Sequence, residues 1–181
     1  MKTAALADYD LYLFHQGTNY HAQEMLGAHY VLQDGRRGVR FAVWAPDART
    51  VSVVGDFNGW DTRVNPLERL PDGEVWSAFL PDLPPDTIYK YAIEPPWGGP
   101  YILKADPYGF FAQKKPETAS LTYDFPDYAW GDGDWQEARQ RGDSYENPML
   151  IYEVHLGSWR RTLEGEYLSY RELADQLVSY A

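Results

Sequence analysis

The chain has 181 residues, of which 24% are charged and 44% are hydrophobic, and its formal net charge is -11. This length suffices for one domain of ordinary size and part of a second, and the composition is that of a globular protein. Because nucleic acids and anionic membranes are polyanions, the negative charge argues against both as partners and favours a neutral one.

The sequence also argues against thiol, metal and cofactor chemistry. It contains no cysteine, which fits the cytoplasm and excludes a disulfide framework. Its four histidines share no metal-ligand spacing. Asp132-Gly133-Asp134 resembles part of a calcium loop, but no glutamate stands at the required later position, so we interpret it as a turn. We therefore expect no metal and no cofactor.

Residues 1–30 form a lead-in segment with two short helical patterns, and residues 31–112 show the two-residue alternation of half-buried strands. Turn signals rich in Pro, Gly, Asn and Asp separate the alternating stretches. The expected strands are 39–44, 50–54, 74–80, 88–94 and 101–104. Short strands at this spacing predict a mainly β fold, an immunoglobulin-like β-sandwich.

A candidate binding loop follows the second expected strand, in the stretch Gly55-Asp56-Phe57-Asn58-Gly59-Trp60-Asp61. The Asn58-Gly59 pair tolerates positive φ, and it places the large ring of Trp60 at the loop tip between two acids. Two interpretations stay open here. Trp60 is either a platform for a ligand or an anchor that packs the loop.

Lys90 and Trp97 extend this candidate surface. Lys90 lies mid-strand between two tyrosines, so it stands on the outer surface if the tyrosines enter the core. Trp97 lies in the next loop, and Trp60, Lys90 and Trp97 could share one patch with the amide of Asn58 nearby. Indole rings stack on the C–H faces of sugars, while ammonium and amide groups hydrogen-bond to their hydroxyls. The alternative is that Trp97 only fills its loop.

The remaining sequence changes character twice. Residues 113–147 lose all periodicity and are interpreted as a linker. In residues 148–181, the apolar run Met149–Leu156 is typical of a strand buried on both faces of a parallel sheet. Ser169 and Glu172 then form a capping box before apolar residues at helical spacing. One strand and one helix cannot form a stable sheet, so we interpret this βα unit as the beginning of a truncated (β/α)8 barrel.

Several dispersed strings resemble a known family. Gly38–Ala48 together with Val54–Trp60 is similar to the glycogen-binding β-sandwich module of α-amylase-superfamily enzymes. Four further strings extend the resemblance to the bacterial glycogen branching enzymes over nearly the whole chain: Lys104–Tyr108, Pro116–Ser120, Ile151–Trp159 and Tyr170–Ala174.

The resemblance implies a sandwich followed by a catalytic barrel, whose remaining part would be the partner of residues 148–181. It implies cleavage of an α-1,4-glucan bond and transfer to a 6-hydroxyl by a retaining two-carboxylate scheme. In the family those carboxylates lie on later barrel strands, so we assign no catalytic residue and expect the chain to be inactive alone. For binding, it implies contact of Trp60, Lys90 and, in a loop that differs in sequence, Trp97 with an α-glucan.

Two other functions compete with this interpretation. A stand-alone glucan-binding module would not need the βα unit. The N-terminal part of a debranching or trehalose-releasing enzyme is a second alternative, but the strings Lys104–Pro107 and Tyr152–Trp159 favour branching. The glucan-binding face also has an alternative role, because in some branching enzymes it packs on the barrel instead.

Overall fold

The structure is a computed structural model that describes residues 6–71, 73–125, 129–142 and 148–180. It divides the chain into two compact units, Met1–Asp127 and Tyr128–Ala181. The first unit contains every named strand and two helices, and the second contains helices and one isolated bridge. Among the described residues, no helix combines the length and apolarity needed to cross a membrane.

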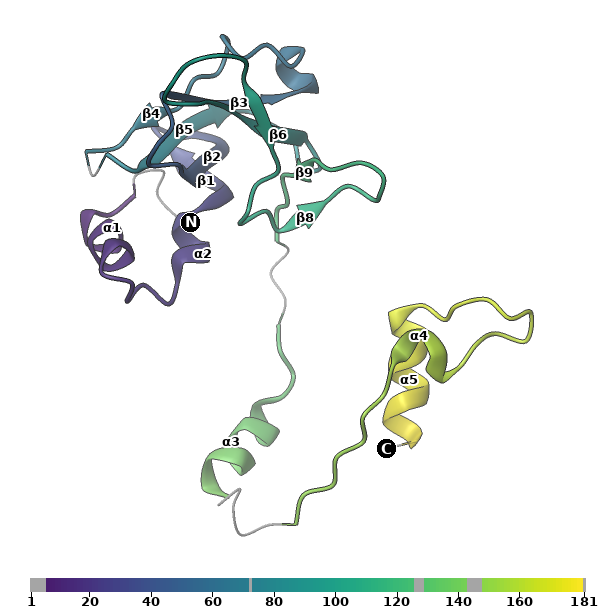
Figure 1. The fold of residues 1–181 in the computed structure, drawn as a ribbon. Helices are drawn as coiled ribbons and strands as arrows, with labels where there is room; N and C mark the ends of the chain where they lie inside the picture. The colour runs from purple at the N-terminus through teal and green to yellow at the C-terminus, as the bar shows by residue number, and fades with distance from the viewer. Residues whose placement is uncertain (1–5, 72, 126–128, 143–147, 181) are drawn as a thin grey trace. The chain divides into compact units, whose positions relative to one another are not determined.

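The first unit is built from two antiparallel sheets that lie face to face (Figure 1). One sheet has the order β1-β2-β5-β4, and the other has the order β3-β6-β9-β8 with β7 also paired to β6. The strands are β1 Gly27–Gln33, β2 Arg36–Trp44, β3 Thr50–Gly55, β4 Glu68–Arg69, β5 Val75–Pro81, β6 Ile88–Glu94, β7 Ile102–Lys104, β8 Phe111–Ala112 and β9 Ser120–Leu121. This arrangement confirms the expected β-sandwich.

The core between the sheets follows from the alternation along each strand. Tyr89 and Tyr91 of β6 are fully buried, whereas Lys90 between them faces the opposite side of the sheet. Phe41 of β2 packs edge-on against Tyr89, with ring centroids 5.0 Å apart. Lys90 therefore stands on the outer face of its sheet, as the sequence predicted.

The second face of the β1-β2-β5-β4 sheet is covered by the helices α1 Asp8–His15 and α2 Ala22–Met25. Leu11 and Met25 pack there against Ala42 of β2 and Val75 of β5. Buried on this face, Arg40 donates hydrogen bonds from Nη2 to the carbonyl oxygens of two α2 residues, and burial lowers the pKa of its guanidinium. Because β2 is covered on both of its faces, six consecutive residues of this strand are buried.

The sandwich extends beyond the expected boundaries at 31 and 112. Strand β1 begins at Gly27, inside the expected lead-in segment, and pairs with β2 along its full length. Strand β9 lies inside the expected linker 113–147 and pairs with β6 through Ser120 opposite Tyr89. The Asp132-Gly133-Asp134 string is also not an isolated turn, because helix α3 Gly133–Arg141 begins there.

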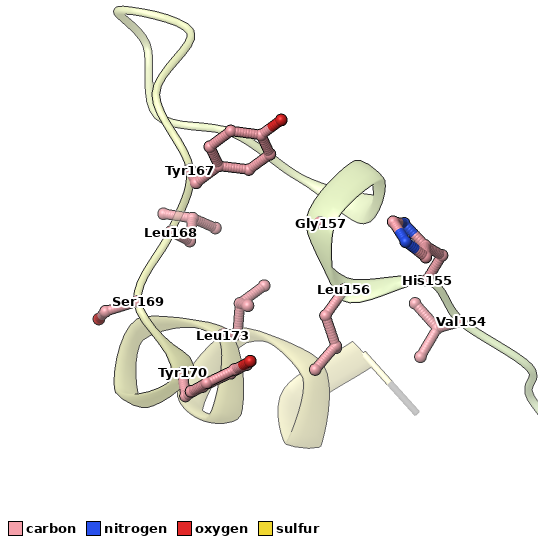
Figure 2. Close-up of a pocket in the computed structure, with 9 residues that line it drawn as sticks. All are labelled: Val154, His155, Leu156, Gly157, Tyr167, Leu168, Ser169, Tyr170 and Leu173. Atoms are coloured by element: carbon pink, nitrogen blue, oxygen red, sulfur yellow. The ribbon is translucent and has the colours of Figure 1, made fainter. Parts of the chain in front are cut away.

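The second unit contains the expected helix, α5 Tyr170–Tyr180, and a short α4 Leu156–Trp159. The capping box at Ser169 forms: Ser169 donates from both N and Oγ to Glu172 Oε2, at 2.8 and 2.7 Å. Figure 2 shows the side chains of Leu156 on α4 and Leu173 on α5 pointing into the hollow between these two helices. The volume of this hollow is about 600 Å³.

The expected strand Met149–Leu156 is not formed. Residues 149–155 have no ladder partner among the described residues, and Leu150 is 99% exposed. A parallel strand takes its hydrogen bonds from neighbours on the sheet, and the described part of this unit supplies none. Residues 149–155 are therefore not part of a named strand, and the described residues do not confirm the first βα unit of a barrel.

Candidate functional site

The loop after β3 holds Trp60 by its backbone and by the edge of its ring. The segment Asp56–Asn58 turns as a 3-10 helix, and Gly59 and Trp60 follow with φ of 63° and 61°. The Trp60 amide donates to the Gly55 carbonyl at 2.9 Å, and its indole Nε1 donates to Asp56 Oδ1 at 2.8 Å. The side chain is 37% exposed, so the ring is anchored along its polar edge while part of its surface meets solvent.

The side chain of Asn58 holds this loop together through hydrogen bonds within the protein. Its Nδ2 donates to the Val53 carbonyl at 3.0 Å and to Asn65 Oδ1 at 2.8 Å, and its Oδ1 accepts from the Gly55 amide at 3.0 Å. Both amide hydrogens are thus used inside the protein. Asn58 therefore positions Trp60 and has no hydrogen left to donate to a ligand.

We expect Asn58→Ala to lower the free energy of unfolding by about 2 kcal/mol, because it leaves partly buried backbone groups without partners. Urea denaturation monitored by fluorescence measures this change. Asn65→Ala is the matched control, since it removes only the 2.8 Å bond to Asn58 and should cost clearly less. An equal cost for the two variants would mean that Asn58 does not hold the loop.

Just after Trp60, Asp61 and Arg63 form an ion pair. Arg63 donates to Asp61 Oδ1 from its amide and from Nε, each at 2.9 Å, and to Oδ2 from Nη2 at 2.7 Å. The hydrogen bonds from the Arg63 side chain are the main cause that lowers the pKa of Asp61 to about 2. Asp61 therefore stays ionised throughout the physiological range.

Lys90 lies at the same end of the sheet as the Trp60 loop. It is paired with Val54, one residue before the Gly55 whose carbonyl binds the Trp60 amide. Its Nζ donates to Thr118 Oγ1 at 2.7 Å. Thr118 lies between β8 and β9, in the segment interpreted as a linker, and only the strand pairing of β9 with β6 could have revealed it as a neighbour of this surface.

The strand register places Leu103 of β7 on the same outer face as Lys90. Leu103 of β7 is opposite Ala92 of β6, which is two residues from Lys90 and so lies on the same outer face. Leu103 is 48% exposed. Trp97 instead follows Glu94, at the other end of β6 from Lys90, and a patch shared by Trp60, Lys90 and Trp97 stays a prediction.

These groups suit binding of an uncharged, hydroxyl-bearing ligand rather than catalysis. The surface offers part of an indole ring, an apolar Leu103 and an ammonium group that already donates to a hydroxyl. The raised pKa of Asp106, by contrast, is caused by burial in the core, where Tyr89 and Tyr91 donate to its Oδ2. No group of three His, Asp or Glu side chains suited to a metal occurs within the described residues.

Comparison with known proteins defines the class of this unit. Residues 25–109 match the family Carbohydrate-binding module 48 (Isoamylase N-terminal domain), which covers both sheets up to Gly109. Residues 25–109 are therefore a carbohydrate-binding module of family 48. A crystal structure from Salmonella typhimurium assigned as an alpha amylase has the same fold, with a TM-score of 0.53 and 24% identity over 77% of this chain and 20% of its own.

The particular relatives are 1,4-alpha-glucan branching enzymes called GlgB. The protein from Halothermothrix orenii is 49% identical over 99% of this chain and 28% of its own length. The protein from Rubrobacter xylanophilus is 54% identical over 97% of this chain and 24% of its own length. The chain thus corresponds to the N-terminal part of the GlgB family and spans about a quarter of the length of these relatives.

Proposed function

We propose that the first unit holds an α-glucan on the outer face of the β3-β6 sheet, at the end that carries Trp60. The observation that supports this most directly is that the Trp60 ring is held in place by a hydrogen bond and is partly exposed to solvent. Its polar edge is fixed by Asp56 while part of the ring stays exposed, at the same end of the sheet as Lys90 and Thr118. A fixed, exposed ring loses little conformational entropy when a sugar stacks on it.

We further propose that the chain is the N-terminal part of a cytoplasmic glycogen branching enzyme. Such an enzyme cleaves an α-1,4-glucan chain and transfers it to a 6-hydroxyl during glycogen biosynthesis. The identity with the GlgB proteins over nearly all of this chain supports the proposal. In it, the unpaired run Met149–Leu156 becomes a strand when the rest of the catalytic barrel supplies its neighbours, and the exposed apolar side chains are then covered.

We expect residues 1–181 alone to show no branching activity, because this proposal places the catalytic carboxylates in the remaining part of the enzyme. The measurement is the colour of an amylose–iodine complex after incubation with the purified chain. Unchanged long-wavelength colour is the expected result. A progressive fall in that colour would show that the chain carries its own catalytic groups.

We expect Trp60→Ala to weaken binding to glycogen roughly 30-fold, the effect of losing about 2 kcal/mol at a central aromatic contact. Retardation in a native gel containing graded glycogen concentrations gives the affinity. The matched control is Trp44→Ala, since Trp44 is an exposed tryptophan on the other sheet whose Nε1 likewise donates to a carboxylate, Glu74 Oε2, at 3.0 Å. Trp44→Ala should bind as the parent chain does.

The same experiment separates a binding platform from a loop anchor. If the parent chain is retarded and Trp60→Ala is retarded equally, then Trp60 only packs its loop. If the parent chain is not retarded at all, the outer face does not bind glucan in this chain and is instead available for packing against the rest of the enzyme.

A further inference from the structure

The β1-β2-β5-β4 sheet carries a pocket that the proposed glucan contact does not use. Its volume is about 480 Å³, within the range of roughly 300–1,000 Å³ that is typical of small-molecule sites. All four strands of the sheet contribute to its lining, which includes Gln33 of β1, Arg40 of β2, Glu68 of β4, and Ser77 and Phe79 of β5. The pocket therefore combines charged, polar and aromatic side chains on one sheet.

The strand register places the central groups of this pocket on the same face. Phe41 enters the core between the two sheets, so Arg40 beside it faces the other way. Arg40 is paired with Phe79, and Ser77, two residues before Phe79, is paired with Glu68. Directly paired residues lie on one face of a sheet. A guanidinium, a ring, a hydroxyl and a carboxylate thus lie on the face that points away from the sandwich core.

The guanidinium of Arg40 has an unused hydrogen-bond donor although it is only 4% exposed. Its Nη2 donates to the carbonyl oxygens of Glu24 and Met25, at 3.0 and 3.1 Å, but its Nε has no partner among the described residues. Burying a charged donor without an acceptor is unfavourable. A bound anion would supply both an acceptor for Nε and the opposite charge.

The other groups of the pocket suit the hydroxyls and C–H faces of a sugar. Ser77 donates its own hydrogen to the Phe41 carbonyl at 2.9 Å, so its oxygen can still accept from a ligand hydroxyl. The carboxylate of Glu68 also accepts hydroxyl hydrogens, and its charge disfavours a second anionic group on the ligand. The ring of Phe79 offers an apolar surface to the C–H groups of a sugar.

We propose that this pocket binds a small sugar that carries one anionic group, either a phosphate or a carboxylate. The anionic group would contact Arg40, and the sugar hydroxyls would contact Ser77, Glu68 and the amide of Gln33. This site lies on a different sheet from Trp60, so the proposal is independent of the proposed glucan contact.

The test follows the Arg40 Nε–H signal in a proton–nitrogen correlation spectrum of residues 1–181, where the signal is identified by its loss in Arg40→Lys. The chain is titrated separately with glucose 6-phosphate, glucuronate, glucose and inorganic phosphate. We expect at least one of the two anionic sugars to shift the signal to saturation, with a dissociation constant of about 1 mM or lower. Glucose and inorganic phosphate should each bind at least about 10-fold more weakly, because each lacks one half of the recognised chemistry.

A pocket-filling variant keeps the proposal testable if Arg40→Lys disturbs the packing of α2. Gln33 is exposed at the end of β1, so Gln33→Trp should fold and melt like the parent while its ring occupies the pocket. We expect Gln33→Trp to bind the anionic sugar at least about 10-fold more weakly than the parent. Equal binding by the folded variant would place the ligand elsewhere and overturn the proposal.

The ligand series gives the remaining outcomes. A response to glucose 6-phosphate alone or to glucuronate alone supports the proposal and identifies the anionic group as phosphate or carboxylate. If neither anionic sugar moves the Arg40 signal, the proposal is wrong, whether or not the chain binds glycogen. If inorganic phosphate binds as tightly as glucose 6-phosphate, the pocket does not recognise the sugar, and the proposal is likewise wrong.

Discussion

Replacing Asp106 by alanine is expected to lower the free energy of unfolding by about 4 kcal/mol, because it removes the acceptor of a buried polar network. Asp106 Oδ2 accepts from the Tyr89 hydroxyl at 2.7 Å and from the Tyr91 hydroxyl at 3.2 Å. Its Oδ1 accepts from the Tyr108 amide at 2.8 Å. All three donors would lose this acceptor inside the sandwich. Guanidinium denaturation measures the loss.

Asp106→Asn is the matched control for this prediction. It also tests how the stability contributed by the Asp106 carboxyl depends on pH. Burial raises the pKa of the Asp106 carboxyl above its ordinary 3.8, so the folded state favours the protonated form. The stability contributed by this group is fully present below pH 3.8 and is lost as the pH rises through the raised pKa. Relative to the parent, Asp106→Asn should therefore gain stability between pH 3 and pH 7. A constant difference across that range would contradict this account.

The second large effect is expected for Gly55→Ala, which we predict to cost about 3 kcal/mol and to displace the Trp60 loop. Gly55 has extended backbone angles that any residue adopts, so the constraint is space. An added Cβ would lie 2.1 Å from the Ile88 carbonyl oxygen and 2.6 Å from Phe57 Cε1. The strand pairing and the loop cannot both keep their positions. Denaturation and glycogen retardation should both change.

Gly59→Ala is the control in the same loop. A Cβ at Gly59 meets no atom within 4 Å, and the cost comes only from its φ of 63°. A left-handed alanine costs about 1 kcal/mol. If Gly55→Ala proves no more costly than Gly59→Ala, then the close approach of β6 to the loop base does not determine where Trp60 lies.

The strands that follow a two-residue alternation were predictable from the sequence. The expected strand at 88–94 coincides with β6, and its buried tyrosines and outward Lys90 follow directly from the pattern. Strand β1 was missed because its residues include His29 and Tyr30, whose burial comes from partners distant in the sequence. The ring of His29, for example, packs edge-on against the ring of Phe110.

For Met149–Leu156, in contrast, the sequence predicted a strand that the structure does not form. Its apolar pattern is that of a buried strand, but a strand needs neighbours for its backbone groups, and the described part of this chain has none to offer it. The pattern describes an environment that the sequence of this stretch cannot create by itself.

The positions of Lys90 and Trp60 in the fold were predictable from the sequence, but the contacts around them were not. Periodicity placed Lys90 outward and turn chemistry placed Trp60 at a loop tip. The sequence could not show that Asn58 is used inside the loop, because that depends on its contacts with Val53 and Asn65. Nor could it show that the register puts Trp97 at the far end of the sheet.

The central claim is that Trp60 contacts an α-glucan. The most direct measurement is a proton–nitrogen correlation spectrum of the chain, in which its seven tryptophans each give one indole signal, titrated with maltoheptaose. We predict that the Trp60 indole signal shifts progressively to saturation while that of Trp44 stays in place. A Trp60 signal that does not move, at maltoheptaose concentrations that shift other residues, would contradict the claim.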